Sequence, residues 1–212
     1  MKPHWLGALR RKWMLYHLAD PHFAFMYDEP PKGEWVTVDC ETTGLDVKRD
    51  QILSVGAIKV RGDAILTSER LDFLVRPKEP VSERTILIHH IRPVDLETAV
   101  PVDEAIRRVL EFVGPRPLVG YFHEFDVGML NKYTRPLIGA GLPNAQIEVS
   151  RLYYDWRAAQ VPPGGNIDLR FETIRQRLDL PRRAAHDAFN DALLTAMMYL
   201  RLKGGWRPNP PE

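Results

Sequence analysis

Two carboxylates stand one residue apart where an apolar run ends. Asp39 and Glu41 flank Cys40 in the stretch VTVDCETTGL, which begins like a buried strand. Side chains two residues apart on a strand point to the same face and lie roughly 7 Å apart along the chain. Two like charges on one face repel each other unless a positive group lies between them. The spacing therefore predicts a positively charged partner for this pair.

Cys40, between the two acids, is the only cysteine in the chain. A single cysteine excludes an internal disulfide and a cysteine-based metal cluster, and it fits a reducing cytoplasm. Because neighbours on a strand face opposite ways, we expect its thiol to point away from the acids into the core, as a small buried hydrophobe rather than a reactive group.

Three further residues with side chains suited to catalysis occur later in the chain. Asp126 follows Phe125 just inside a predicted helix, and His186 and Asp191 stand five residues apart where the last long helix opens. Five residues are about one and a half helical turns, so the last two reach one site only if His186 precedes the helix proper. The proline-containing loop before it is consistent with that placement.

The elements that must position these residues follow from hydrophobic periodicity. Strands are expected at residues 35–40, 51–60, 70–75, 118–121 and 146–151. Helices are expected at residues 102–112, 124–133, 169–178 and 188–202. A short Gly- and Asp-containing turn at residues 61–63 favours an antiparallel meander. Hairpin strands followed by helix–strand units predict an α/β fold with a mixed five-stranded sheet flanked by helices.

Composition limits the class of protein. The chain has 212 residues, of which 44% are hydrophobic and 27% charged, and its formal net charge is +1. This is typical of one globular domain, and it gives no whole-molecule attraction to polyanions, so a nucleic-acid partner would bind through local patches. The sequence has no apolar run long enough to span a bilayer and no uninterrupted signal-peptide core. We therefore expect a cytoplasmic protein with no membrane association.

The first 33 residues are predicted to be a helical extension and linker. Leu6, Leu9, Trp13 and Tyr16 recur at helical spacing, and basic residues 10–12 are spread among them. Such a helix either docks on nucleic acid, a membrane surface or a partner, or packs against its own domain, and we favour the packing. The main domain is then expected at residues 34–205, followed by a flexible, Pro-rich tail at residues 206–212.

Taken together, three motifs resemble those of the DnaQ-like 3′-to-5′ exonucleases of the four-acid-plus-histidine (DEDDh) type, typified by the epsilon proofreading subunit of bacterial DNA polymerase III. They are Asp39-x-Glu41-Thr-Thr-Gly, Phe125-Asp126 and His186-x4-Asp191, and the similarity covers about residues 34–203. The resemblance implies an RNase H-like fold. It also implies metal-dependent release of nucleoside 5′-monophosphates from the 3′ end of DNA, preferably single-stranded.

The resemblance also implies a role for each acid. Asp39, Glu41 and Asp191 would ligate one of two divalent cations, Mg²⁺ or Mn²⁺, and Asp126 would hold the other. These cations would screen the repulsion between the carboxylates. His186 would act as general base toward the attacking water.

Residues expected to contact the substrate follow the first strand. By resemblance, Thr42 and Thr43 would meet the terminal nucleotide, Leu45 would wedge against its base, and Gly44 would permit a sharp turn and a close approach of substrate. His89, in a segment similar to the family's Ile-His-Gly-Ile, would touch the end nucleotide or serve as an ordinary loop histidine.

The second motif departs from the family pattern. Where the family often has His-Asn-x-x-Phe-Asp, this chain has Tyr121 and Phe122 in place of the His-Asn pair. These aromatic residues either stack on a base or fill the core at a strand end, and we favour the core. Arg182 and Arg183 are candidates for contacts with backbone phosphates, with a solvated loop as the alternative. Residues 176–180 faintly resemble a sliding-clamp-binding peptide, and we interpret them as part of a core helix.

Two other functions stay open at this point. One is a 3′-to-5′ exoribonuclease or oligoribonuclease, and the other is a non-catalytic nucleic-acid-binding subunit on the same fold. The complete set of four acids and His186 favours an enzyme. The expected partners are single-stranded DNA or other 3′ ends of nucleic acid, and a DNA polymerase or another replication or repair protein.

Overall fold

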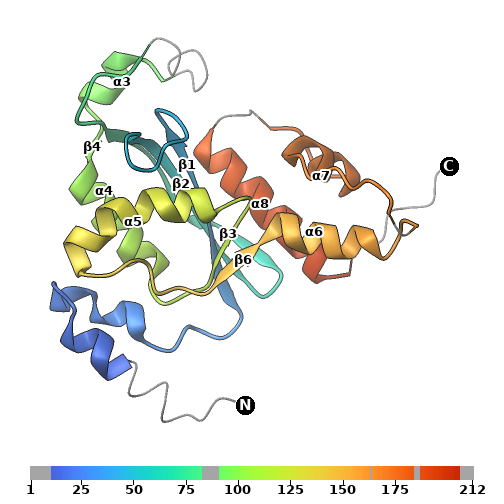
Figure 1. The fold of residues 1–212 in the computed structure, drawn as a ribbon, viewed down its shortest axis with the longest axis horizontal. Coiled ribbons are helices and arrows are strands. Elements are labelled where there is room, and N and C mark those ends of the chain that lie inside the picture. Colours follow the sequence, from blue (N-terminus) through green and yellow to red (C-terminus); the bar gives the residue numbers. More distant parts are fainter. Residues whose placement is uncertain (1–10, 83–90, 163, 184–186, 206–212) are drawn as a thin grey trace.

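A mixed β-sheet with helices on both faces forms the centre of the fold (Figure 1). The computed structural model describes residues 11–82, 91–162, 164–183 and 187–205. In these ranges the sheet has six strands in the order β4-β3-β2-β1-β5-β6. The strands are β1 (Glu34–Thr42), β2 (Ile52–Arg61), β3 (Ala64–Arg76), β4 (Val100–Pro101), β5 (Leu118–Gly120) and β6 (Gln146–Glu148). The predicted α/β fold is confirmed, with one strand more than the five expected.

The antiparallel meander of β1, β2 and β3 is confirmed. β3 is longer than predicted, because its first residues pair with residues 59–61 of β2 beyond a register shift at Ile58/Lys59. The additional strand, β4, runs parallel to the end of β3 and has only two residues. A strand of that length is too short for alternation to show in the sequence.

On the other side of β1, strands β5 and β6 are parallel to it and to each other. The predicted strand at residues 146–151 is wrong in its second half, since the chain turns into helix α6 (Val149–Ala158) after Glu148. The Glu148 side chain caps this helix by accepting a hydrogen bond from the Ser150 N–H at 2.9 Å. Glutamate is not among the preferred helix caps, so the sequence carried no start signal there.

The helices lie in two layers, one on each face of the sheet (Figure 1). The α-helices are α3 (Pro93–Glu97), α4 (Val102–Val113), α5 (Glu124–Ile138), α6, α7 (Phe171–Arg177) and α8 (Ala188–Lys203), and η1 (Pro21–Tyr27) is a 3₁₀ helix. The four predicted helices are confirmed, and α5 runs five residues further than expected. None of the helices in the described ranges has the length and apolarity needed to cross a bilayer.

Strand β1 separates the two layers by simple alternation. Val36, Val38 and Cys40 belong to the hydrophobic cluster that includes α4 and α5. The intervening Asp39 and Glu41 therefore face the layer that contains α8. The expectation that the Cys40 thiol points into the core, away from the two acids, is confirmed, since this side chain is buried within that cluster.

The segment before β1 packs against the same core, through residues that periodicity did not single out. Phe23 and Met26, in η1, are 0% and 2% exposed and belong to the cluster of α4 and α5. Trp13 and Tyr16, by contrast, are 61% and 85% exposed, on a helix that covers residues 11–16. Leu6 and Leu9 lie outside the described residues. The boundary between extension and domain at residue 33 stays a prediction.

Helix α8 rests directly on the sheet where β2 has no side chain. A Cβ atom at Gly56 would lie 2.2 Å from the backbone of both Ala188 and Phe189, the first residues of α8. Contacts this short do not occur in proteins, so only glycine lets the start of the helix approach β2 so closely. Gly56 therefore fixes the height of α8 above the sheet.

We predict that Gly56→Ala lowers the free energy of unfolding by about 2–3 kcal/mol, because the added methyl group must push α8 off β2. The loss is measured by urea denaturation. Gly62→Ala is the matched control: it has a φ of +60° and no atom within 4 Å of the added Cβ, so it carries only backbone strain of about 1 kcal/mol. Equal losses in the two variants would contradict the close contact at Gly56.

Candidate active site

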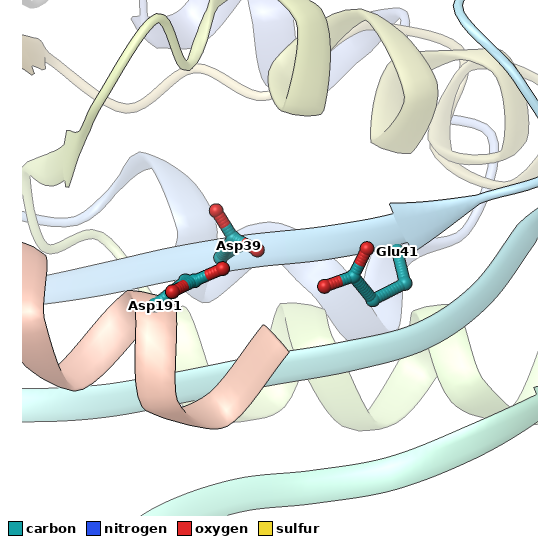
Figure 2. A group of neighbouring side chains, drawn as sticks. All are labelled: Asp39, Glu41 and Asp191. Carbon is teal, nitrogen blue, oxygen red and sulfur yellow. The ribbon is translucent and has the colours of Figure 1, made fainter. Parts of the chain in front are cut away.

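Three acidic side chains from two distant segments meet on the α8 face of the sheet (Figure 2). Asp39 and Glu41 project from β1, and Asp191 projects from the first turn of α8. Each offers one carboxylate oxygen, and these oxygens all lie within 4.8 Å of one another. The structure thus brings together three of the residues that the sequence predicted to be metal ligands.

Asp191 reaches this position because the start of α8 is fixed by its cap. Asp187 precedes the helix and accepts a hydrogen bond from the Asn190 N–H at 2.8 Å. The Asp191 N–H in turn donates to the Asp187 carbonyl oxygen at 2.9 Å. A side-chain cap of this kind stabilises the first turn of a helix by about 1 kcal/mol. The cap and the close approach at Gly56 together hold Asp191 over β1.

Asp126 approaches the cluster from the other layer, in the first turn of α5. Its Oδ1 atom accepts a hydrogen bond from the Cys40 N–H at 3.0 Å. Pairing between β1 and β5 covers only Val36 and Thr37, so Cys40 lies beyond the part of β1 that β5 covers. The Asp126 carboxylate supplies the acceptor that a longer β5 would have provided. It lies next to the three converging oxygens but is not one of that group.

Burial raises the pKa values of Asp39 and Asp126, and neighbouring negative charges add to this effect. Desolvation, followed by the charges of Asp126 and Asp191, raises the pKa of Asp39 well above its usual range. Desolvation also raises the pKa of Asp126 to about 7, although the Cys40 N–H donates to the ionised form and opposes this. Without a cation, Asp39 and Asp126 therefore hold protons at pH values where exposed carboxyl groups are ionised.

The donor set fits a hard divalent cation. Oxygen ligands lie roughly 2.0–2.6 Å from Mg²⁺ or Ca²⁺, so two ligands of one ion are no more than about 5 Å apart. The mutual separation of the three oxygens, within 4.8 Å, meets this condition. A set of carboxylates without a thiolate favours such ions over zinc. Asp39, Glu41 and Asp191 are therefore able to share one cation.

Asp50, which the sequence analysis did not single out, holds the loop after β1 in place. The Thr43 hydroxyl donates to the Asp50 carboxylate at 2.8 Å, and the Thr42 hydroxyl donates to the Gly44 carbonyl oxygen at 2.7 Å. A Cβ at Gly44 would lie 2.7 Å from the same Asp50 carboxylate, so glycine is needed there for that approach. Leu45, beyond it, is 86% exposed and able to contact a ligand. No motif marks Asp50, because its role arises from a contact across the loop.

The segment after β5 differs from expectation. Tyr121 is partly buried, packs against the cluster of α6, α7 and α8, and donates its hydroxyl to the Leu169 carbonyl oxygen at 2.8 Å. The expectation of a core side chain is wrong for Phe122, which is 55% exposed and has a φ of +46°. Its N–H donates to the Glu148 carboxylate, which turns the side chain away from the core.

Several predicted contacts are not tested by this geometry. His186 and His89 lie outside the described residues. Arg182 and Arg183 are exposed, and their contact with phosphates stays a prediction. Leu178 is fully buried, in agreement with a core role for residues 176–180.

We predict that the cation-free protein loses stability as the pH rises from about 4 to about 7. The pKa of Asp126 is higher in the folded chain, about 7, than its usual value of 3.8, so between these values the folded state binds more protons than the unfolded state. The free energy of unfolding therefore falls with rising pH in this window. It is measured by urea denaturation in EDTA at several pH values.

Asp126→Asn is the informative variant, because it keeps an acceptor for the Cys40 N–H and removes the titrating proton. We expect a shallower pH dependence and a higher stability than the unsubstituted chain at pH 7. Asp63→Asn, at a side chain that is 95% exposed, serves as control and should leave the slope unchanged. A slope that is identical in all three proteins would contradict the raised pKa.

Comparisons with known proteins agree with this geometry. Residues 36–199 match the model of a family described as Exonuclease (RNase_T). The chain is 29% identical over 184 residues to the DNA polymerase III subunit epsilon of Aquifex aeolicus, covering 87% of each protein. It is 26% identical over 185 residues to the PolC-type DNA polymerase III of Thermotoga maritima, covering 86% of this chain and 13% of that protein.

Among solved structures, E. coli Exonuclease I in complex with a 5cy-dT13 oligonucleotide superimposes with a TM-score of 0.68 at 17% identity, covering 82% of this chain and 41% of that one. At this identity the likeness concerns the fold. The chain thus spans most of one relative and a small part of larger ones, and the matched region begins in β1 and ends in α8, the two elements that carry the three converging acids.

Proposed function

The chain belongs to the exonuclease family and is a hydrolytic 3′-to-5′ exonuclease, and we propose that its substrate is the 3′ end of single-stranded DNA, from which it releases nucleoside 5′-monophosphates. The preference for DNA is supported by the similarity to a DNA polymerase III epsilon subunit over 87% of both chains. The preference for a single strand is supported by the shared fold with Exonuclease I, whose structure holds a dT13 oligonucleotide.

The convergence of Asp39, Glu41 and Asp191 is the observation that carries this proposal. Their oxygens approach within 4.8 Å although one of the three residues is about 150 positions away in the chain. Three carboxylates do not gather in a partly buried place without a compensating charge, because each loses hydration and repels the others. A divalent cation bound between the carboxylates supplies that charge, and such a cation is what a metal-dependent phosphodiester hydrolase requires.

The cation sites follow from the same side chains. We expect Asp39, Glu41 and Asp191 to hold one Mg²⁺ or Mn²⁺, with Asp39 shared with a second ion held by Asp126. When bound, such ions lower the pKa of a coordinated water and stabilise the leaving 3′-oxygen in an in-line displacement. The hydrogen bond from the Cys40 N–H fixes the Asp126 carboxylate next to the other acids.

The remaining roles concern the proton and the substrate. His186, close in sequence to Asp191, would accept the proton of the attacking water, a contribution of about 10²–10⁴-fold in rate. Backbone groups around Thr42 and Thr43 would orient the terminal nucleotide, in a loop that the hydrogen bond from the Thr43 hydroxyl to the Asp50 carboxylate holds in place. Gly44 keeps that loop close to Asp50, Leu45 would contact the terminal base, and His89 would contact the same nucleotide.

A DNA polymerase is the proposed partner of the exonuclease. The support is the similarity to a protein named as a polymerase III subunit and to part of a PolC-type polymerase. A cytoplasmic location is part of the same proposal.

We predict that purified protein shortens 5′-labelled single-stranded DNA from its 3′ end with Mg²⁺ or Mn²⁺ and not in EDTA. Asp39→Asn should reduce the rate at least about 100-fold, because the variant loses a charged ligand from the cation site. Asp63→Asn, on the exposed turn between β2 and β3, is the matched control and should keep full activity. Products are identified by chromatography against nucleoside 5′-monophosphates.

RNA of the same sequence is the comparison substrate. Faster cleavage of RNA would assign the chain to the exoribonucleases and overturn the preference for DNA. An unchanged rate in Asp39→Asn would show that the activity belongs to a contaminant.

We predict that Mn²⁺ raises the melting temperature of the protein in a saturable manner, since ligands that bind the folded state stabilise it by RT ln(1 + [L]/Kd). Isothermal titration calorimetry, with a short DNA oligonucleotide present, should give two ions per chain. Asp126→Asn should reduce this to one, and Asp39→Asn should remove both. Two ions bound by Asp39→Asn would contradict the shared ligand.

A further inference from the structure

Phe122 is an exposed aromatic residue in a backbone conformation that bulky side chains avoid. Its φ is +46°, and among the described residues other than glycine only Asp179 also has a positive φ. A large residue in the left-handed region is strained, and such strain is found at functional sites more often than elsewhere. The ring gains little burial in exchange, because Phe122 is 55% exposed.

Glu148 holds this conformation. Its carboxylate accepts hydrogen bonds from the backbone N–H of Phe122 at 3.0 Å and of His123 at 3.2 Å, and its Oε2 lies 3.0 Å from the His123 Nδ1 atom. Burial raises the pKa of Glu148, but hydrogen bonds from His123 and Ser150 outweigh this and lower it to about 2. The anion therefore persists at neutral pH and fixes the end of β5 in place.

The Phe122 ring has one aromatic neighbour among the described residues. Its centroid lies 4.7 Å from that of Tyr121, which in turn lies 5.0 Å from the Phe171 ring. Tyr121 is anchored from below by the hydrogen bond from its hydroxyl to the Leu169 carbonyl oxygen. Phe171, Tyr121 and Phe122 thus form a row of aromatic rings whose exposed end is Phe122.

This exposed end lies beside the acidic site. Asp126 follows Phe122 by four residues, and its carboxylate accepts a hydrogen bond from the Cys40 N–H, between Asp39 and Glu41 on β1. Leu45, which is 86% exposed, follows the carboxyl end of β1, and Phe122 follows the carboxyl end of the parallel strand β5. Both side chains therefore stand at the same edge of the sheet as the acids.

We propose that Phe122 stacks on an unpaired base of the nucleic acid whose 3′ end occupies the acidic site. Stacking on an aromatic ring accepts every base and requires a single strand, because the faces of paired bases are covered by their neighbours. The formal net charge of +1 gives the protein little general attraction for a polyanion, so contacts of this kind supply affinity. The inference rests on the proposed exonuclease function and adds a specificity residue to it.

Phe122→Gly tests this role because it separates stacking from folding. Glycine adopts positive φ without strain, so the melting temperature should stay the same or rise. The KM for single-stranded DNA should rise by roughly 5- to 150-fold, which corresponds to the stacking energy of about 1–3 kcal/mol per base. Phe122→Trp should keep the KM near its original value. Tyr154→Ala, at an aromatic residue on α6 that is 44% exposed, is the control and should leave the KM unchanged.

Oligonucleotides with a single abasic position near the 3′ end identify the stacked base. At one position, removing the base should raise the KM of the original protein. The KM of Phe122→Gly should not change, because this variant already lacks the ring that would stack on that base. A lower melting temperature with an unchanged KM in Phe122→Gly would overturn the proposal and assign Phe122 a structural role. If the original protein and Phe122→Gly both cleave DNA with the same KM, this inference is overturned and the proposed function stands. If the original protein has no nuclease activity, the proposed function itself is overturned.

Discussion

Repulsion among partly buried carboxylates is the constraint on which the site depends. Asp39, Glu41 and Asp191 approach one another closely enough for one cation to touch all three, and desolvation and neighbouring charges raise the pKa of Asp39. The fold must therefore provide stabilisation elsewhere to hold them together. It does so through the packing of α8 on β2 and through the hydrophobic layers on both faces of the sheet.

Because side chains alternate along β1, one face of the strand packs in the core and the other carries the acids. Val36, Val38 and Cys40 secure one face of the strand to α4 and α5, and the residues between them present acids to α8. We therefore expect substitutions on the first face to lower stability, and substitutions at Asp39 and Glu41 to affect the proposed catalysis. Asp126 connects α5 to this strand, because its carboxylate accepts a hydrogen bond from the Cys40 N–H of β1.

Sequence patterns predicted the helices and strands that are long enough to show a hydrophobic period. They missed the features that depend on contacts between distant segments. Alternation located β1 and β2, and helical periodicity located α4 and α8, because each has enough residues for a period to show. The start of α6 was not predicted, because its cap is Glu148, a residue type that rarely caps helices. The same carboxylate also accepts a hydrogen bond from the Phe122 N–H, just after β5. Asp50 and Gly56 escaped as well, because their roles are set by partners in other segments. The exposure of Phe122 has the same origin in Glu148.

The solitary thiol of Cys40 has a practical use. It sits in the strand that carries two of the acids, is buried in the core, and has its pKa raised by burial and by Asp126. An alkylating reagent therefore reaches the sulfur only when β1 opens, since the thiolate is the reactive form. The rate of labelling therefore reports the opening of β1 without an added probe, and comparing it with the rate of global unfolding separates local opening from denaturation.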